Sequence, residues 1–167
     1  TANWYFVGWS DSDFGSDTSK SHTLYMAGER FYPSSDCSLW AVFAWQPLKE
    51  EGYMTELLTG TYMYVNSTGN KALSGIPAEG KMAAADVDNR NLNLHYYVDF
   101  TDAQTAYITH VATGTPIGYS GTQMAATASA WQVYHEGDQT LFYMTYENKT
   151  YVLWLNIQDN KETTTYA

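Results

Sequence analysis

The sequence predicts an all-β protein of about nine or ten antiparallel strands, and three observations lead to this prediction. Aromatic residues, which are enriched in strands, make up 16% of the 167 residues and include 15 Tyr and 6 Trp. Good helix formers never gather into a long amphipathic run. Short apolar segments recur between clusters of turn residues, which is typical of a β-sandwich or a closed β-barrel.

The clearest strand pattern lies in residues 91–111. Every second residue from Leu92 to Phe100 is apolar, as in a strand with one buried face. The polar segment Thr101–Gln104 follows, and a second β-rich run extends from Thr105 to Val111. Two strands joined by a short polar turn predict an antiparallel hairpin, and in simple register His95 and His110 approach each other.

The other elements are predicted from apolar runs and from the turn residues that bound them. We expect strands over 3–9, 39–45, 53–65, 131–135, 141–146 and 151–157. The segment 39–45 is almost continuously apolar, so both of its faces should be buried, and Gly60 should bend the strand 53–65. We expect a loop at 75–80, a strand or helical turn at 81–86, a short helix at 123–130 and a hairpin turn at 147–149.

Length and charge restrict the organisation and the partners of the chain. Its 167 residues suit a single domain, residues 1–167, with a polar C-terminal tail at 159–167. The 8 Lys+Arg against 18 Asp+Glu give a net charge of −10, which disfavours nucleic acids and anionic membranes. Cationic ligands and divalent metal ions are compatible with this charge, and so is a plain acidic surface.

Two N-glycosylation sequons favour a secreted glycoprotein, and a single cysteine leaves its stability to packing. Cys37 is the only cysteine, so no intramolecular disulfide can form. No apolar segment has the length of a membrane span, and no signal-peptide pattern begins at Thr1. Asn66 and Asn148 each begin an N-glycosylation sequon after an aromatic strand, where a turn is expected.

The acidic loop after the first strand is the candidate metal site. Asp11, Asp13 and Asp17 supply carboxylates around Gly15, and calcium prefers several oxygen ligands on a flexible loop. The EF-hand spacing is not met, because Gly15 occupies a ligand position. A calcium site and a solvated acidic loop therefore both explain this segment.

No catalytic arrangement is evident. The histidines at 22, 95, 110 and 135 do not have metal-ligand spacing, and no nucleophile elbow or phosphate-binding loop occurs. We therefore predict that the protein is not an enzyme and has no catalytic residues. The sequence identifies no cofactor.

Two short motifs resemble those of the lipocalins or, more loosely, the calycins. The first strand contains Trp4-Tyr5, and Thr101-Asp102 forms a turn between two later strands, with Tyr107 further on. This resemblance spans about residues 3–111 and implies a single antiparallel up-and-down β-barrel that holds one small ligand in its mouth. The chain differs from the family at Ala2, where lipocalins have Gly.

Two functional hypotheses follow from the aromatic content. In the first, a secreted transport protein holds a small hydrophobic or cationic organic ligand in a barrel cavity. We expect this cavity to be lined by Trp40, Tyr62, Tyr64, Tyr96, Tyr107 and Trp131. In the second, a β-sandwich (jelly-roll) module binds carbohydrate or joins an extracellular oligomeric assembly, with calcium in the acidic loop. A row of aromatic residues on an open sheet face would favour the second hypothesis.

Overall fold

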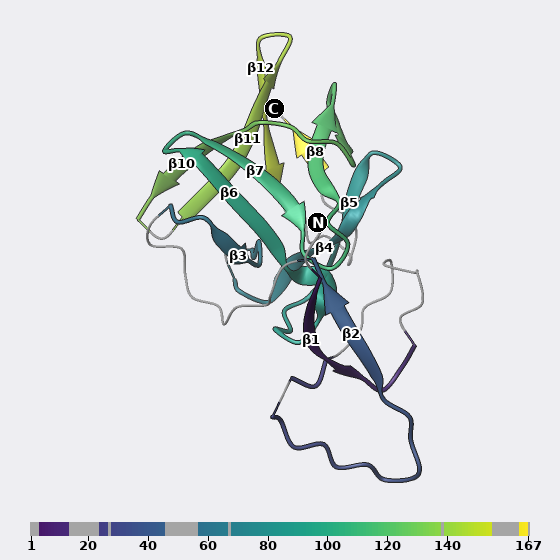
Figure 1. Cartoon of the computed structure of the whole chain (residues 1–167). Coiled ribbons are helices and arrows are strands. Elements are labelled where there is room, and N and C mark those ends of the chain that lie inside the picture. The colour runs from purple at the N-terminus through teal and green to yellow at the C-terminus, as the bar shows by residue number, and fades with distance from the viewer. Residues whose placement is uncertain are drawn as a thin grey trace.

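The computed structural model describes residues 4–13, 24–26, 28–45, 57–66, 68–137, 139–154 and 164–166 (Figure 1). In these residues the protein is all-β, with antiparallel sheets and one short 3-10 helix, so the predicted fold class is confirmed at this level. The described strands form three sheets, which do not close into a barrel. Thirteen strands are seen in this part of the chain, more than the sequence indicated.

The largest sheet has nine strands and divides at β7. Its members are β3 (Gly60–Tyr62), β6 (Tyr96–Asp102), β7 (Thr105–His110), β8 (Pro116–Ser120), β9 (Gln123–Ala125), β10 (Trp131–Glu136), β11 (Gln139–Tyr146), β12 (Lys149–Trp154) and β13 (Thr164–Tyr166). They follow the order β13-β12-β11-β10-β7-β6-β3, with β9 on β8 and β8 on β7. The start of β7 pairs with β10, whereas its end pairs with β8.

Two sheets of two strands each accompany the large one. β1 (Tyr5–Ser10) pairs with β2 (Trp40–Ala44), and β4 (Lys71–Ala78) pairs with β5 (Lys81–Asp86). Figure 1 shows β1 and β2 side by side, projecting beyond one end of the large sheet. The β4–β5 hairpin is tied to its neighbours by a bridge between Val65 and Ala72 and by a 2.9 Å hydrogen bond from the Met124 N–H to the Gly80 carbonyl.

Several predicted elements are corrected. Residues 75–78 belong to β4 rather than to a loop, because Pro77 lies in a bulge where no ladder bond is needed. Glu79 and Gly80 both have positive φ, at 50° and 77°, as a two-residue hairpin turn requires. No helix occurs at 123–130, where β9 forms, and the predicted polar tail contains β13. The long strand expected at 53–65 is reduced to β3, and residues 53–56 lie outside the described part.

The central hairpin is confirmed over β6 and β7, but its first residues are not a strand. Leu92–Leu94 forms the 3-10 helix η1. The Asn91 side chain accepts a 3.1 Å hydrogen bond from the Asn93 N–H, and the Leu94 N–H donates to the Asn91 carbonyl. Local capping by an asparagine therefore replaces the ladder that the alternating pattern indicated.

The buried side chains form two clusters. The main core lies between the large sheet and the β4–β5 hairpin and includes Leu73, Met82, Tyr96, Trp131 and Phe142. The second core joins β1 and β2 to the large sheet and consists of Val7, Leu24, Val42, Ala44, Leu92 and Val111. The β1–β2 sheet thus has one buried face, and its outer face is left to solvent in the described structure.

Candidate functional site

A β-bulge in β1 turns two aromatic side chains to the same outer face. Phe6 pairs with Phe43, but the next paired residue of β1 is Gly8, so Val7 is the extra residue of the bulge. Val7 and Gly8 are both buried. Strict alternation would place Phe6 and Trp9 on opposite faces, whereas the bulge leaves both of them exposed.

These residues belong to a group of aromatic side chains that are linked by ring contacts and by one backbone bridge. The Phe6 ring lies 5.3 Å from Trp9 and 5.8 Å from Phe43, measured between ring centroids. Trp9 exchanges two backbone hydrogen bonds with Tyr25, of 2.8 and 2.7 Å, so their side chains share a face. The Tyr25 ring in turn lies 4.7 Å from Phe31. We call these five residues, Phe6, Trp9, Tyr25, Phe31 and Phe43, the outer aromatic band.

Gly8 is required for the approach of Tyr25 to β1. A Cβ atom at this position would lie 2.6 Å from the Tyr25 carbonyl oxygen, far inside van der Waals contact. We expect Gly8→Ala to break the bridge to Tyr25 and to lower the free energy of unfolding by about 1–2 kcal/mol. Urea denaturation measures this, with Gly60→Ala as the control, because a Cβ there meets only ordinary contacts of 3.5 Å or more. Equal stability of the two variants would contradict this placement of Tyr25.

One end of the outer aromatic band is acidic. The Tyr25 hydroxyl donates a 3.3 Å hydrogen bond to Asp11 Oδ2. Partial desolvation raises the pKa of Tyr25, and the negative charge of Asp11 raises this pKa further. Glu29 accepts a 3.0 Å hydrogen bond from the Met26 N–H and forms an ion pair with Arg90. The exposed Asp11 therefore places a carboxylate beside the Tyr25 ring.

The predicted calcium loop is only partly described. Asp11 and Asp13 are exposed, and Asp17 lies outside the described residues. Within the part of the chain that the structure covers, no three His, Cys, Asp or Glu side chains come together as a metal site would require. The calcium site therefore remains a prediction.

The six predicted cavity residues separate into two groups. Tyr62, Tyr64, Tyr96 and Trp131 all belong to the main core or pack against it. Trp40 and Tyr107 are exposed, at the end of β2 and on the other face of β7 respectively. The expectation that both faces of residues 39–45 are buried is wrong: Ala41 and Phe43 are exposed, because β2 belongs to a sheet of only two strands.

The polar atoms of the core aromatic residues are already hydrogen-bonded to backbone carbonyls. Tyr96 Oη donates to the Gly75 carbonyl at 2.7 Å, and Tyr64 Oη donates to the Leu153 carbonyl at 2.8 Å. Trp131 Nε1 donates to the Ile117 carbonyl at 2.8 Å. Burial raises the pKa of both tyrosines well above the usual range. These bonds suit structural core residues, because no donor is left to orient a ligand.

Both histidines of the central hairpin are buried, but the bulge between Phe100 and Asp102 shifts the register, so His110 pairs with Tyr96 and not with His95 as simple register predicts. His95 Nε2 lies 2.8 Å from the Asn89 carbonyl oxygen. His110 Nδ1 lies 3.0 Å from the Thr113 hydroxyl, whose own proton is directed to Thr115. His110 Nε2 is buried and has no hydrogen-bond partner among the described residues.

Burial gives both histidines a strong preference for the neutral form. Burial lowers the pKa of His110 to about 4. The neighbouring His95 lowers this pKa further, whereas the backbone of Asn93 raises it. Burial also lowers the pKa of His95, although the Asn89 carbonyl and the Asp88 carboxylate favour its protonation. The pair is thus a buried titratable cluster beside the β1–β2 sheet.

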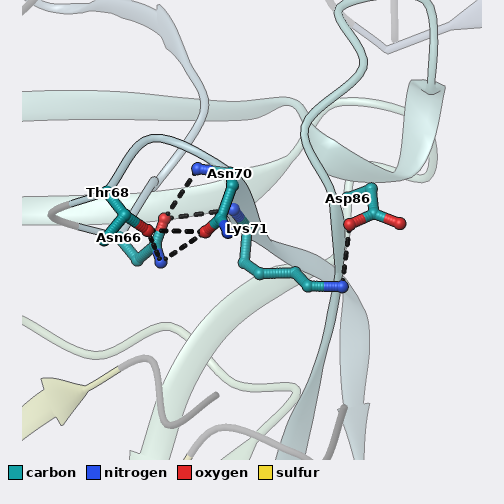
Figure 2. A network of polar contacts seen from close by, with 5 residues as sticks. All are labelled: Asn66, Thr68, Asn70, Lys71 and Asp86. Atoms are coloured by element: carbon teal, nitrogen blue, oxygen red, sulfur yellow. Dashed lines mark hydrogen bonds and ion pairs between the residues drawn. The ribbon is translucent and has the colours of Figure 1, made fainter.

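The two sequons have different surroundings. The Asn66 amide holds its turn together: Nδ2 donates to Thr68 and Asn70, and Oδ1 accepts from the Asn70 and Lys71 N–H groups (Figure 2). Lys71 also pairs with Asp86 at 2.7 Å. Asn148 is exposed in the two-residue turn between β11 and β12, with φ of 60°.

We therefore expect Asn66→Ala to destabilise the protein by about 1 kcal/mol, because the turn loses its side-chain hydrogen bonds. Thermal denaturation measures this effect. Asn148→Gly is the matched control and should be neutral or slightly stabilising, because glycine adopts positive φ without strain. A smaller loss for Asn66→Ala than for Asn148→Gly would contradict the role of the amide network.

The sequence did not reveal the outer aromatic band, although one signal was present. A glycine inside an aromatic strand, as in Phe6-Val7-Gly8-Trp9, marks a bulge or a close backbone approach. Among the described residues, no helix has the length and apolar character needed to cross a membrane. Comparison of the chain with protein-family models, with curated proteins and with solved structures finds no match in any of the three.

Proposed function

We propose that this protein is a non-enzymatic binding module that takes a cationic segment of a partner protein on its outer aromatic band. The observation that carries the proposal is the cluster of three exposed rings, Phe6, Trp9 and Phe43, on one face of the β1–β2 sheet, with the Asp11 carboxylate bound to the neighbouring Tyr25. Phe6, Trp9 and Phe43 are 40%, 41% and 53% exposed although they are large and apolar. Contiguous apolar surface of this kind is typical of interaction sites.

Charge complementarity selects the partner. The net charge of −10 repels anionic partners over most of the surface. Trp and Tyr faces attract Arg and Lys by cation–π interaction, and Asp11 adds a carboxylate beside Tyr25. A segment rich in Arg or Lys would therefore be attracted both by the aromatic faces and by the carboxylate.

Ring geometry favours a protein segment over a carbohydrate chain. The Phe6 ring is inclined by 70° to Trp9 and by 67° to Phe43. A sugar chain stacks best on rings that lie in one plane, whereas edge-to-face rings form an uneven surface into which side chains can insert. Aromatic anchors of this type carry much of the binding energy in protein interfaces.

A titration with a hexa-arginine peptide tests the proposal. We expect Trp9→Ala and Phe43→Ala each to weaken binding at least about tenfold, as expected for aromatic anchors. Tyr107→Ala is the matched control, because Tyr107 is exposed to a similar degree on the large sheet. All three variants keep the net charge, so attraction that depends on charge alone would be unaffected. Equal affinity of the wild type and the two band variants would overturn the proposal.

Two further probes separate the competing chemistries. Hexaglutamine has the same peptide length without charge, and it should bind far more weakly than hexa-arginine. Cellohexaose, a neutral sugar chain, should not bind measurably. Tighter binding of cellohexaose than of hexa-arginine would replace the proposed partner with a carbohydrate.

A carrier that holds a small organic ligand among the aromatic residues of the main core is the second candidate. The observation that favours it is the convergence of Tyr62, Tyr64, Tyr96 and Trp131 from different parts of the chain on one core. Native mass spectrometry of the protein purified from its own source would reveal a bound organic mass that is lost on denaturation. Loss of such a mass together with unchanged binding in the Trp9→Ala variant would support this candidate.

A further inference from the structure

We propose that the buried pair His95 and His110 is a pH-sensitive latch that holds the β1–β2 sheet, and with it the outer aromatic band, against the large sheet. The neutral pair keeps the latch closed, and proton uptake favours its release. This inference deepens the proposed function, since it concerns regulation of the same surface, but its first test needs no binding partner.

The pair lies where the two cores meet. On one side, the His110 ring lies 5.4 Å from the ring of Tyr96, a residue of the main core. On the other side, Val111 directly follows His110 and Leu92 lies three residues before His95, and both belong to the second core together with Val7 of β1. Both histidines are at most 1% exposed. A charge placed on either ring would therefore be desolvated between the two cores.

A short chain of backbone hydrogen bonds ties β2 to the pair. The Val111 N–H donates to the His95 carbonyl at 3.0 Å, and the Trp45 N–H donates to the Val111 carbonyl at 2.8 Å. Trp45, directly after β2, also packs edge-to-face against Tyr97 of β6 at 5.9 Å. Movement of His95 or His110 would act on β2 through Val111.

The groups that face the pair do not compensate a buried proton. Asp88, on the loop before η1, favours protonation of His95, but burial outweighs this effect and the pKa is lowered. Tyr96, on β6, directs its hydroxyl to the Gly75 carbonyl. For His110, the backbone of Asn93 favours protonation, whereas the neighbouring His95 opposes it. Release of the sheet would expose the pair to water and allow both rings to protonate.

The direction of the pH effect follows from the folded pKa of about 4 for His110 and the ordinary value of 6.5. The open form binds the proton more tightly, so lower pH favours opening. His110 alone should increase the opening equilibrium about 20-fold between pH 7 and pH 5.

Native-state hydrogen exchange, corrected for the intrinsic exchange rate at each pH, tests the latch. Amides of β1 and β2 should exchange through a local opening. This opening should have a lower free energy, and a weaker dependence on urea, than the opening that exposes the amides of β10 and β11. Their protection should fall about 20-fold from pH 7 to pH 5. Protection of β1 and β2 that is independent of pH, or that equals that of β10 and β11 at every urea concentration, would overturn the inference.

Two variants assign the effect to the histidine. His110→Phe keeps a ring against Tyr96, and His110→Gln keeps a polar group, so at least one should fold. In either variant the fall in β1–β2 protection should shrink severalfold, whereas His135→Gln should retain it. A full 20-fold fall in a folded His110 variant would overturn the assignment.

Hexa-arginine binding to the wild type at pH 7 separates the two proposals. A pH-dependent opening without any peptide binding would contradict the proposed function and leave the latch intact. Binding that depends on Trp9, together with pH-independent exchange, would contradict the latch alone.

Discussion

Trp131→Ala is expected to lower the free energy of unfolding by about 3–5 kcal/mol. The Trp131 side chain is fully buried in the main core, and the Tyr119 ring packs edge-to-face on it at 5.0 Å. Truncation would leave a cavity and also remove the Nε1 donor from the buried Ile117 carbonyl. Urea denaturation followed by circular dichroism measures the loss.

Two variants show which part of the side chain matters. Trp131→Phe retains most of the apolar volume and loses the donor, so it should cost about 1–3 kcal/mol. Tyr134→Ala, on the same strand but 50% exposed, should cost less than about 1 kcal/mol. If Trp131→Ala cost no more than Tyr134→Ala, Trp131 would not be a core residue, and a ligand cavity at this position would gain support.

Acidification from pH 7 to pH 4.5 is expected to remove roughly 2 kcal/mol of stability through His110. The pKa of His110 is about 4 in the folded protein and rises to 6.5 on unfolding. Between these values the unfolded chain binds more protons, so stability rises with pH across this window and falls as pH is lowered. His95 acts in the same direction, because burial lowers its pKa as well.

The measurement is the free energy of unfolding from urea titrations between pH 4.5 and pH 7. Carboxylates also titrate near the lower limit, so the informative quantity is the difference between the wild type and His110→Phe. The slope with pH should be smaller in this variant, whatever its absolute stability. Parallel pH profiles for the two proteins would show that His110 is already exposed to protons in the folded state.

Much of the large sheet could be predicted from the sequence because its strands obey local rules. The alternation from Tyr96 to Phe100 places Tyr96 and Val98 in the core as expected. The turn at Glu147 and Asn148 was also recognisable, and both residues have positive φ as a tight hairpin requires. The 3-10 helix was not predictable from periodicity, since it depends on the side-chain cap of Asn91.

The candidate site was harder to predict, because it depends on contacts between distant segments. The bulge at Val7 reverses the face on which Trp9 lies, and a one-residue change of register moves every later side chain to the other face. Tyr25 joins the band through a single bridge to Trp9, 16 positions earlier in the chain. The aromatic content indicated binding, but only the pairing shows which rings are exposed together.

The most direct test of the central claim is a hydrogen-exchange footprint of hexa-arginine on the wild-type protein at pH 7. We predict that added protection is confined to β1, to β2 and to the segment around Tyr25, where the outer aromatic band lies. Protection that falls instead on β6, β7 and β10, around Tyr96 and Trp131, would contradict this account and place the binding site inside the main core.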